Sequence, residues 1–185
     1  MLETLGNLDT TLFHFINGTL ANPVTDLVMP VVTNDWFLRV LYAVAMVLIL
    51  WKGDRRLRWL VLFSAITIAF TDQISSVWLK HLFARPRPCH TILDMHLLVN
   101  CGAGYSMPSS HAANAFGQAA LFGLSYGRWR WHLFGFAAIV AISRTFVGVH
   151  YPFDILVGMV VGSLVGVAVL FAYEQAMRML PPREV

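Results

Sequence analysis

Long apolar segments separated by short polar turns recur along the whole chain, and this pattern predicts an all-α, polytopic membrane protein. Five segments approach the roughly 20 residues that a membrane-crossing helix needs. They cover residues 36–51, 57–83, 109–126, 131–149 and 152–173. In the last segment Gly158, Gly162 and Gly166 recur every four residues, which predicts a smooth face for close helix packing.

In the first 34 residues the pattern for a membrane-crossing helix is weaker. Residues 8–16 are amphipathic at helical spacing, and a second apolar piece covers residues 24–32. Each piece is too short to cross a membrane alone, so they either lie in the interface or pair as one broken span. We therefore expect a single domain over residues 1–185, a bundle of about six membrane helices, with residues 1–34 forming an interfacial or broken helix.

Two short basic turns predict the orientation of these helices. Residues 52–58 read Lys-Gly-Asp-Arg-Arg-Leu-Arg, and residues 127–131 read Gly-Arg-Trp-Arg-Trp. Short loops rich in Lys and Arg face the cytoplasm. The long polar loop of residues 84–108, in which Pro86 and Pro88 argue against a regular helix, is therefore expected on the outer side.

The composition supports a membrane protein and argues against a soluble domain or a nucleic-acid-binding protein. Of the 185 residues, 57% are hydrophobic and 12% are charged, about half the charged fraction of a soluble domain. The net charge of +3 is small, and the basic residues lie at the edges of loops. They are therefore interpreted as topology signals, and no nucleic-acid partner is expected.

Three ionisable residues lie in one of the most apolar regions of the chain: Arg144, His150 and Asp154. Such groups are costly at membrane depth and are kept there when they pair with each other or take part in chemistry. Two interpretations are open for Arg144 and Asp154, a structural ion pair and a functional site. The turn Tyr151-Pro152 separates His150 from Asp154 and suits the start of a helix.

The predicted topology brings residues from four parts of the chain to the outer face, and these residues suit an anion. Lys80, Arg87 and Arg144 supply three cations, and arginine's planar fork suits phosphate. Ser109 and Ser110 start a helix, where free N–H groups and the helix dipole bind anions. The residues on this face are Lys80, Arg87, Ser109, Ser110, His111, Arg144, His150 and Asp154.

These residues suggest covalent phosphoryl transfer. A neutral His150 imidazole could attack phosphorus, Asp154 could orient it, and His111 could give a proton to the leaving group. The carboxylates are too few and too scattered for a two-metal site, so neither a metal nor a cofactor is expected. Taken singly, Lys80 would more often be a snorkelling anchor and His111 a helix-start histidine, while Asp72 and Gln73 are assigned to interhelical hydrogen bonds.

Three motifs occur in order. They are Lys80-x6-Arg87-Pro88, then Pro108-Ser109-Ser110-His111, then Ser143-Arg144-x5-His150-x3-Asp154. Together they resemble the type 2 phosphatidic acid phosphatase family, which shares its site with vanadium haloperoxidases. Ser110 stands where many members have glycine. The resemblance covers residues 80–154 through these motifs and the flanking helices through topology only.

The resemblance implies a lipid phosphatase with a phospho-histidine intermediate. Residues matching His150 and His111 would be the nucleophile and the general acid, and those matching Lys80, Arg87, Ser109, Ser110 and Arg144 would bind phosphate. Bacterial members suggest a multi-pass protein of the inner membrane with its site facing the periplasm or exterior. The short chain favours undecaprenyl diphosphate as substrate, with phosphatidylglycerol phosphate, phosphatidate and lipid A as alternatives. A non-enzymatic lipid-phosphate transporter and vanadate-dependent oxidation are the rival functions.

Both cysteines, Cys89 and Cys101, lie in the loop that is expected outside. An oxidising compartment permits disulfides. The sequence therefore predicts a Cys89–Cys101 disulfide that stiffens this loop, with two free thiols as the alternative.

Overall fold

The computed structural model describes residues 2–179, and every regular element among them is helical. The elements are α1 (Leu2–His14), η1 (Phe15–Thr19), α2 (Pro23–Val32), α3 (Asp35–Lys52), α4 (Arg55–Asp72), η2 (Gln73–Leu79), α5 (Lys80–Phe83), α6 (Pro88–Thr91), α7 (Ser110–Ser125), η3 (Gly127–Trp129), α8 (Arg130–Phe146) and α9 (Pro152–Met179). Each of the five predicted apolar segments is helical. The loop after α5 holds a one-turn helix, α6, that starts at Pro88, because proline tolerates the first helical position.

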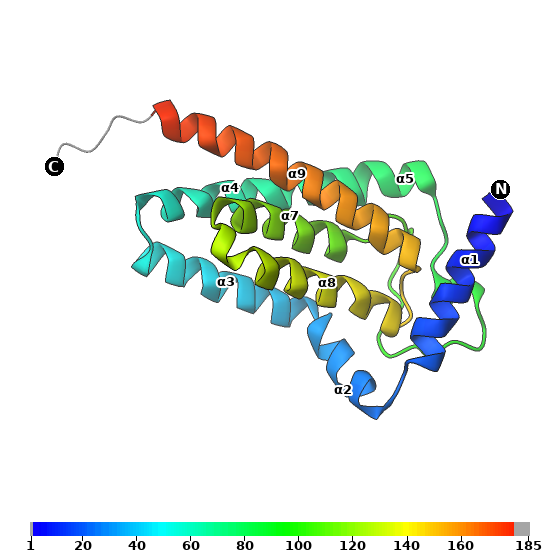
Figure 1. The fold of residues 1–185 in the computed structure, drawn as a ribbon. Coiled ribbons are helices and arrows are strands. Elements are labelled where there is room, and N and C mark those ends of the chain that lie inside the picture. The colour runs from blue at the N-terminus through cyan, green and yellow to red at the C-terminus, as the bar shows by residue number, and fades with distance from the viewer. Residues whose placement is uncertain (1, 180–185) are drawn as a thin grey trace.

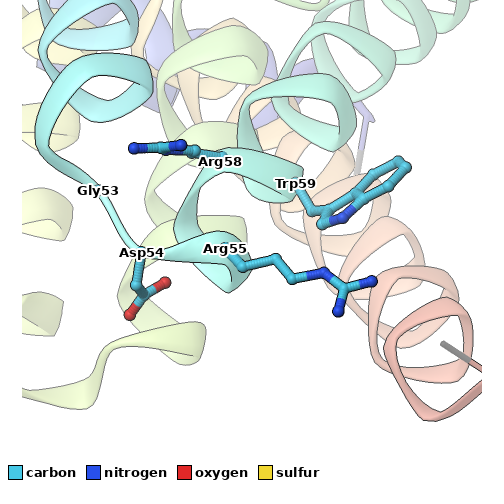
Figure 2. Close-up of a pocket in the computed structure, with 5 residues that line it drawn as sticks. All are labelled: Gly53, Asp54, Arg55, Arg58 and Trp59. Atoms are coloured by element: carbon cyan, nitrogen blue, oxygen red, sulfur yellow. The ribbon is translucent and has the colours of Figure 1, made fainter. Parts of the chain in front are cut away.

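The bundle has two chemically distinct ends (Figure 1). The α3–α4 turn, the α7–α8 turn and the end of α9 lie at one end, while α1, α2, α5 and the start of α9 lie at the other. The α3–α4 turn forms a shallow basic pocket of about 400 Å³ lined by Gly53, Asp54, Arg55, Arg58 and Trp59 (Figure 2). The basic turns therefore share one end, as the sequence predicts.

Two stretches are long and apolar enough to cross a membrane: a helical run over residues 55–91 and α9. A third qualifies if α2 and α3, which are bent by 56°, count as one span. Residues 24–32 thus form α2, which can join α3 in such a bent span, while an interfacial position for residues 8–16 stays a prediction. Helix α1 lies at the end of the bundle opposite the basic turns, and its Asp9 and Phe13 are buried.

Glycines let α9 pack directly on α7, as predicted. A Cβ atom on Gly158 would lie 2.5 Å from the Ser109 carbonyl oxygen, and one on Gly162 would clash with the carbonyl of Ala113. This close approach fixes the start of α7 against the start of α9, where the Ser109 N–H donates to the Asp154 carbonyl at 2.9 Å. Close packing of two helices thereby sets the position of two predicted site residues.

We expect Gly162→Ala to destabilise the bundle, because the new methyl group meets backbone that cannot yield without separating the two helices. Overpacking of this kind costs about 1–3 kcal/mol, so the thermal midpoint in detergent should fall by several degrees. Gly135→Ala in α8 is the matched control, since a Cβ atom there meets nothing within 4 Å. Equal midpoints for the two variants would contradict the close-packing interpretation.

Among the described residues, hydrogen bonds between polar side chains join the helices, but they do not involve Asp72 and Gln73, the residues predicted to form them. Asp72 accepts a hydrogen bond from Ser76 one turn later in its own helical run, at 3.3 Å. The side-chain bonds between α4 and α7 instead run from Ser64 to Gln118, at 2.6 Å, and from Thr71 to Asn114. The assignment of Asp72 and Gln73 to this task is therefore not supported by the hydrogen bonds of the described chain.

Candidate active site

His150 lies in the tight turn between α8 and α9. The turn requires Gly148, whose φ of 87° favours glycine and whose Cβ position is occupied by Met95 and the His96 carbonyl. The His150 N–H donates to the Arg144 carbonyl at 3.3 Å, and the residue is 2% exposed. The local chain therefore buries the imidazole with a fixed orientation.

The two ring nitrogens of His150 have different neighbours. Nε2 lies 3.5 Å from Nη1 of Arg87, while Nδ1 lies 3.2 Å from the Ser106 hydroxyl and 3.5 Å from a carboxylate oxygen of Asp154. Burial lowers the pKa of His150 to about 3, which keeps the imidazole neutral at physiological pH. A neutral imidazole is the form that can act as a nucleophile.

Asp154 is fully buried, and several donors satisfy its carboxylate. One oxygen accepts from Arg85 at 2.8 Å, and the other accepts from the Ser106 hydroxyl and from the Tyr151 N–H, the latter at 2.8 Å. The ion-pair partner of Asp154 among the described residues is thus Arg85, and the predicted alternative of a structural Arg144–Asp154 pair is wrong.

Arg85 also holds Asp9 from the first helix, at 2.7 Å. The other oxygen of Asp9 accepts from the Phe153 N–H at 2.9 Å, and the Arg85 guanidinium lies over the Tyr151 ring, 4.0 Å from its centroid. Burial raises the pKa of Asp9, whereas the Phe153 N–H and Arg85 lower it. Helix α1 is therefore tied to the segment that carries the candidate nucleophile.

The three predicted phosphate-binding cations lie near each other. The charges of Lys80, Arg87 and Arg144 repel one another, so an anion between them would be stabilised. Lys80 follows the π-helical stretch η2, which changes the face that later residues occupy. The buried Arg87 is held by the carbonyls of Gly104 and Val149, at 3.2 and 3.3 Å.

Two buried polar atoms of this cluster are orphaned within the described part of the chain: the Ser109 hydroxyl and Nε of Arg144. Buried polar groups usually have a partner, and orphans at a site indicate a ligand. Ser109 precedes α7, whose N-terminus suits an anion. The Ser110 hydroxyl differs, because it already pairs with Ser76 of η2 at 2.9 Å, which leaves its backbone as the group available to phosphate.

His111 and Arg144 both contact the segment that connects α2 to α3. Nε2 of His111 lies 3.2 Å from the Thr33 carbonyl and 3.3 Å from a carboxylate oxygen of Asp35. Nη1 of Arg144 donates to the Thr33 hydroxyl at 2.5 Å. The Asp35 carboxylate therefore lies beside a ring nitrogen of His111 that can carry a proton.

Cys89 and Cys101 form a disulfide in the loop between α5 and α7, across a sequence separation of 12 residues. With His90 they are the group of possible metal ligands found among the described residues. Because both sulfurs are used in the disulfide, the group offers no thiolate to a metal in this form.

An apolar cavity of about 620 Å³ adjoins this cluster between α3, α4, α7 and α8. Asp35, Ser110 and His111 line it, and it extends along α7 to Phe122. At ~1.5 Å per residue this stretch of α7 measures roughly 18 Å. The cavity is thus long enough for a hydrocarbon chain whose polar head lies at His111.

Sequence reasoning missed five residues of the polar network around the predicted ones. They are Asp9, Thr33, Asp35, Arg85 and Ser106. Arg85 lies inside the first motif and Ser106 lies two residues before the second, so their position and polar side chains could have indicated a role at the site. Asp9, Thr33 and Asp35 lie in the N-terminal segment, where nothing in the local pattern indicates a contact with residues more than 70 positions away.

Comparisons with known proteins agree with the geometry. The profile of the PAP2 superfamily matches residues 59–178. A lipid A 4'-phosphatase of Bacteroides thetaiotaomicron is 32% identical over 179 residues, covering 90% of this chain and 77% of the relative. An undecaprenyl-diphosphatase of Bacillus subtilis is 29% identical and covers 84% of this chain and 79% of the relative.

A solved structure has the same fold. The crystal structure of a transmembrane PAP2 type phosphatidylglycerolphosphate phosphatase from Bacillus subtilis superposes with a TM-score of 0.77. The match covers 96% of this chain and 90% of that chain at 21% identity. At this identity the match supports the architecture of the bundle and not a substrate.

Proposed function

The chain belongs to the PAP2 superfamily and is a membrane phosphatase that acts on lipid phosphates, and we propose that it uses His150 as nucleophile on a lipid diphosphate. The observation that carries this proposal is the setting of His150. Its Nε2 faces the cationic pocket beside Arg87, while its Nδ1 faces Ser106 and Asp154.

In the first step the lone pair of Nε2 of His150 forms a bond to phosphorus, and the bond from phosphorus to the leaving oxygen breaks. His111 gives its proton to that oxygen. Lys80, Arg87 and Arg144, with the Ser109 hydroxyl and the free N–H groups at the start of α7, stabilise the charge on the transferred phosphoryl group. The products are a phospho-histidine and the lipid monophosphate.

In the second step water attacks phosphorus and gives a proton to His111, and the nitrogen–phosphorus bond breaks. The electron pair returns to Nε2, and inorganic phosphate leaves. His111 ends protonated, and His150 ends neutral, so the site is ready for another substrate. His111 therefore alternates between acid and base across the two steps.

The charge of the pocket supports a diphosphate. Arg85 is shared by the Asp9 and Asp154 carboxylates, and together with Lys80, Arg87 and Arg144 it gives four cations against these two carboxylates, an excess of positive charge. An ester with two phosphoryl groups matches that excess better than a monophosphate does. Undecaprenyl diphosphate is thus the proposed substrate, with its chain in the cavity along α7, which is lined mainly by apolar residues.

Lipid A is the second candidate, and a specific observation favours it. The lipid A 4'-phosphatase of Bacteroides thetaiotaomicron matches 90% of this chain at 32% identity. In either case the proposed setting is a multi-pass bundle of about six helices in a bacterial inner membrane, with the α1 and α2 end facing the periplasm. The basic turns at the other end support this orientation.

Release of phosphate by the purified protein in detergent tests the proposal. Undecaprenyl diphosphate, lipid A, phosphatidylglycerol phosphate and phosphatidate should be compared at equal mole fraction, with and without EDTA. We expect the highest kcat/KM for undecaprenyl diphosphate and equal rates in EDTA. A preference for lipid A would replace the substrate but keep the chemistry, whereas loss of activity in EDTA would overturn the metal-independent mechanism.

A further inference from the structure

Ser106 is a buried hydroxyl at the active site that none of the three motifs includes. It is fully buried, and its hydroxyl lies 3.2 Å from Nδ1 of His150 while donating to Asp154. The direct distance from Nδ1 to the Asp154 carboxylate is longer, at 3.5 Å. Ser106 is therefore the nearer hydrogen-bond partner of the imidazole.

The hydrogen-bonding capacity of a serine hydroxyl fixes the direction of each bond. The hydroxyl has one proton to donate and can accept at its oxygen. An ionised carboxylate only accepts, so the Ser106 proton goes to Asp154. Toward His150 the hydroxyl oxygen must then accept, which places a proton on Nδ1 and leaves the Nε2 lone pair free. That is the tautomer required for attack on phosphorus from the Arg87 side.

We propose that Ser106 is a positioning residue that connects Asp154 to His150 and sets the tautomer of the nucleophile. This inference rests on the proposed role of His150. The bridge also matters after attack, because the imidazole becomes a cation when the nitrogen–phosphorus bond forms. Its Nδ1–H then points at a hydroxyl polarised by Asp154, so the positive charge is stabilised without proton transfer to the carboxylate.

The surrounding structure holds Ser106 in this role. Its N–H donates to the Arg85 carbonyl at 2.8 Å, while the Arg85 side chain pairs with Asp154. The Tyr151 N–H occupies a further site on the same carboxylate oxygen that receives the serine proton. The backbone and side chain of Arg85 therefore fix the serine and the aspartate relative to each other.

Ser106→Ala tests the bridge. We expect kcat to fall about 10- to 100-fold with KM within threefold of the wild type, because the variant binds substrate but no longer fixes the tautomer. Single turnovers with ³²P-labelled substrate, quenched in alkaline detergent because phospho-histidine is labile in acid, should show the same loss in the rate of phosphoenzyme formation. Ser106→Thr keeps the hydroxyl and should recover most of the rate, which a purely steric role for the serine would not explain.

Ser125→Ala is the matched control, since the Ser125 hydroxyl bonds only to the Leu121 carbonyl of its own helix, at 2.6 Å. Should Ser106→Ala fail to fold, Ser106→Cys, which has a similar size and a weaker donor, replaces it with the same expected direction. Phosphoenzyme formation at the wild-type rate in the folded variant would overturn the bridge and leave the role of His150 intact.

A double-mutant cycle separates the bridge from two independent effects. If Ser106 acts through Asp154, the double variant Ser106→Ala/Asp154→Asn should be no more than about threefold slower than Asp154→Asn alone. Losses that multiply would contradict the inference. A wild-type protein that hydrolyses substrate without any phosphoenzyme, or an active His150→Ala variant, would instead count against the proposed function itself.

Discussion

Replacement of His150 by alanine is expected to reduce turnover by on the order of 10⁴-fold or more, because the variant lacks the atom that forms the bond to phosphorus. Among the described histidines only His150 is buried, and its Nε2 lies beside the Arg87 guanidinium. Phosphate release in detergent and labelling by ³²P substrate measure the two consequences, loss of turnover and loss of the phosphoenzyme. The label on the wild-type protein should be acid-labile, as expected for phospho-histidine.

Two comparisons keep this result from being a folding artefact. His150→Gln retains more of the buried volume and should be equally inactive, while His132→Ala at the other end of α8 should keep full activity. Thermal midpoints of all three variants check the fold. Full activity of His150→Ala would refute the mechanism.

Asp154→Asn should also slow turnover. Since the substitution removes a carboxylate partner of Arg85, it should lower the thermal midpoint of unfolding as well.

Arg87→Lys is expected to lower kcat/KM by about 100-fold although it conserves the charge. Lysine lacks the planar fork, and Arg87 uses its fork to reach the Gly104 and Val149 carbonyls while facing His150. Bound orthovanadate resembles the five-coordinate transition state of phosphoryl transfer. Its inhibition constant therefore measures the loss of anion binding in Arg87→Lys. Its inhibition constant should rise at least about tenfold.

Arg58→Lys is the control for this substitution, because Arg58 lies in the basic turn at the opposite end of the bundle (Figure 2). It should leave both kcat/KM and vanadate inhibition unchanged. An unchanged inhibition constant in Arg87→Lys would mean that the phosphoryl group does not bind beside Arg87. Such a result would move the anion site toward Lys80 and Arg144 without changing the nucleophile.

Much of the fold was predictable because membrane helices carry strong local signals. The apolar segments, the basic turns and the glycines of α9 each act through neighbours in sequence or through one partner helix. The last helix, for example, was predicted from its proline start and apolar length, and it does begin at Pro152. Spacing also predicted that Gly162 packs closely on a neighbouring helix, although not that the neighbour is α7.

The network behind the motifs was not predictable, for a physical reason. Whether Asp154 pairs with Arg144 or with Arg85 depends on how the loop after α5 folds back, and no periodicity specifies that path. Asp9 lies in a short helix whose sequence favours the interface, and Asp35 is the first residue of α3. Only the tertiary structure places them against Arg85 and His111. Side-chain chemistry indicated which residues were costly to bury, but not which partners compensate that cost.

The link between Asp9 and Phe153, which are 144 positions apart, also bears on how the enzyme is made. During synthesis α1 enters the membrane before α9 has been made. Asp9 and Arg85 therefore lack their partners Phe153 and Asp154 until α9 is present. Until then the nascent chain has no assembled nucleophile. We therefore expect hydrolysis to become possible only after the start of α9 has been synthesised and has packed beside α1.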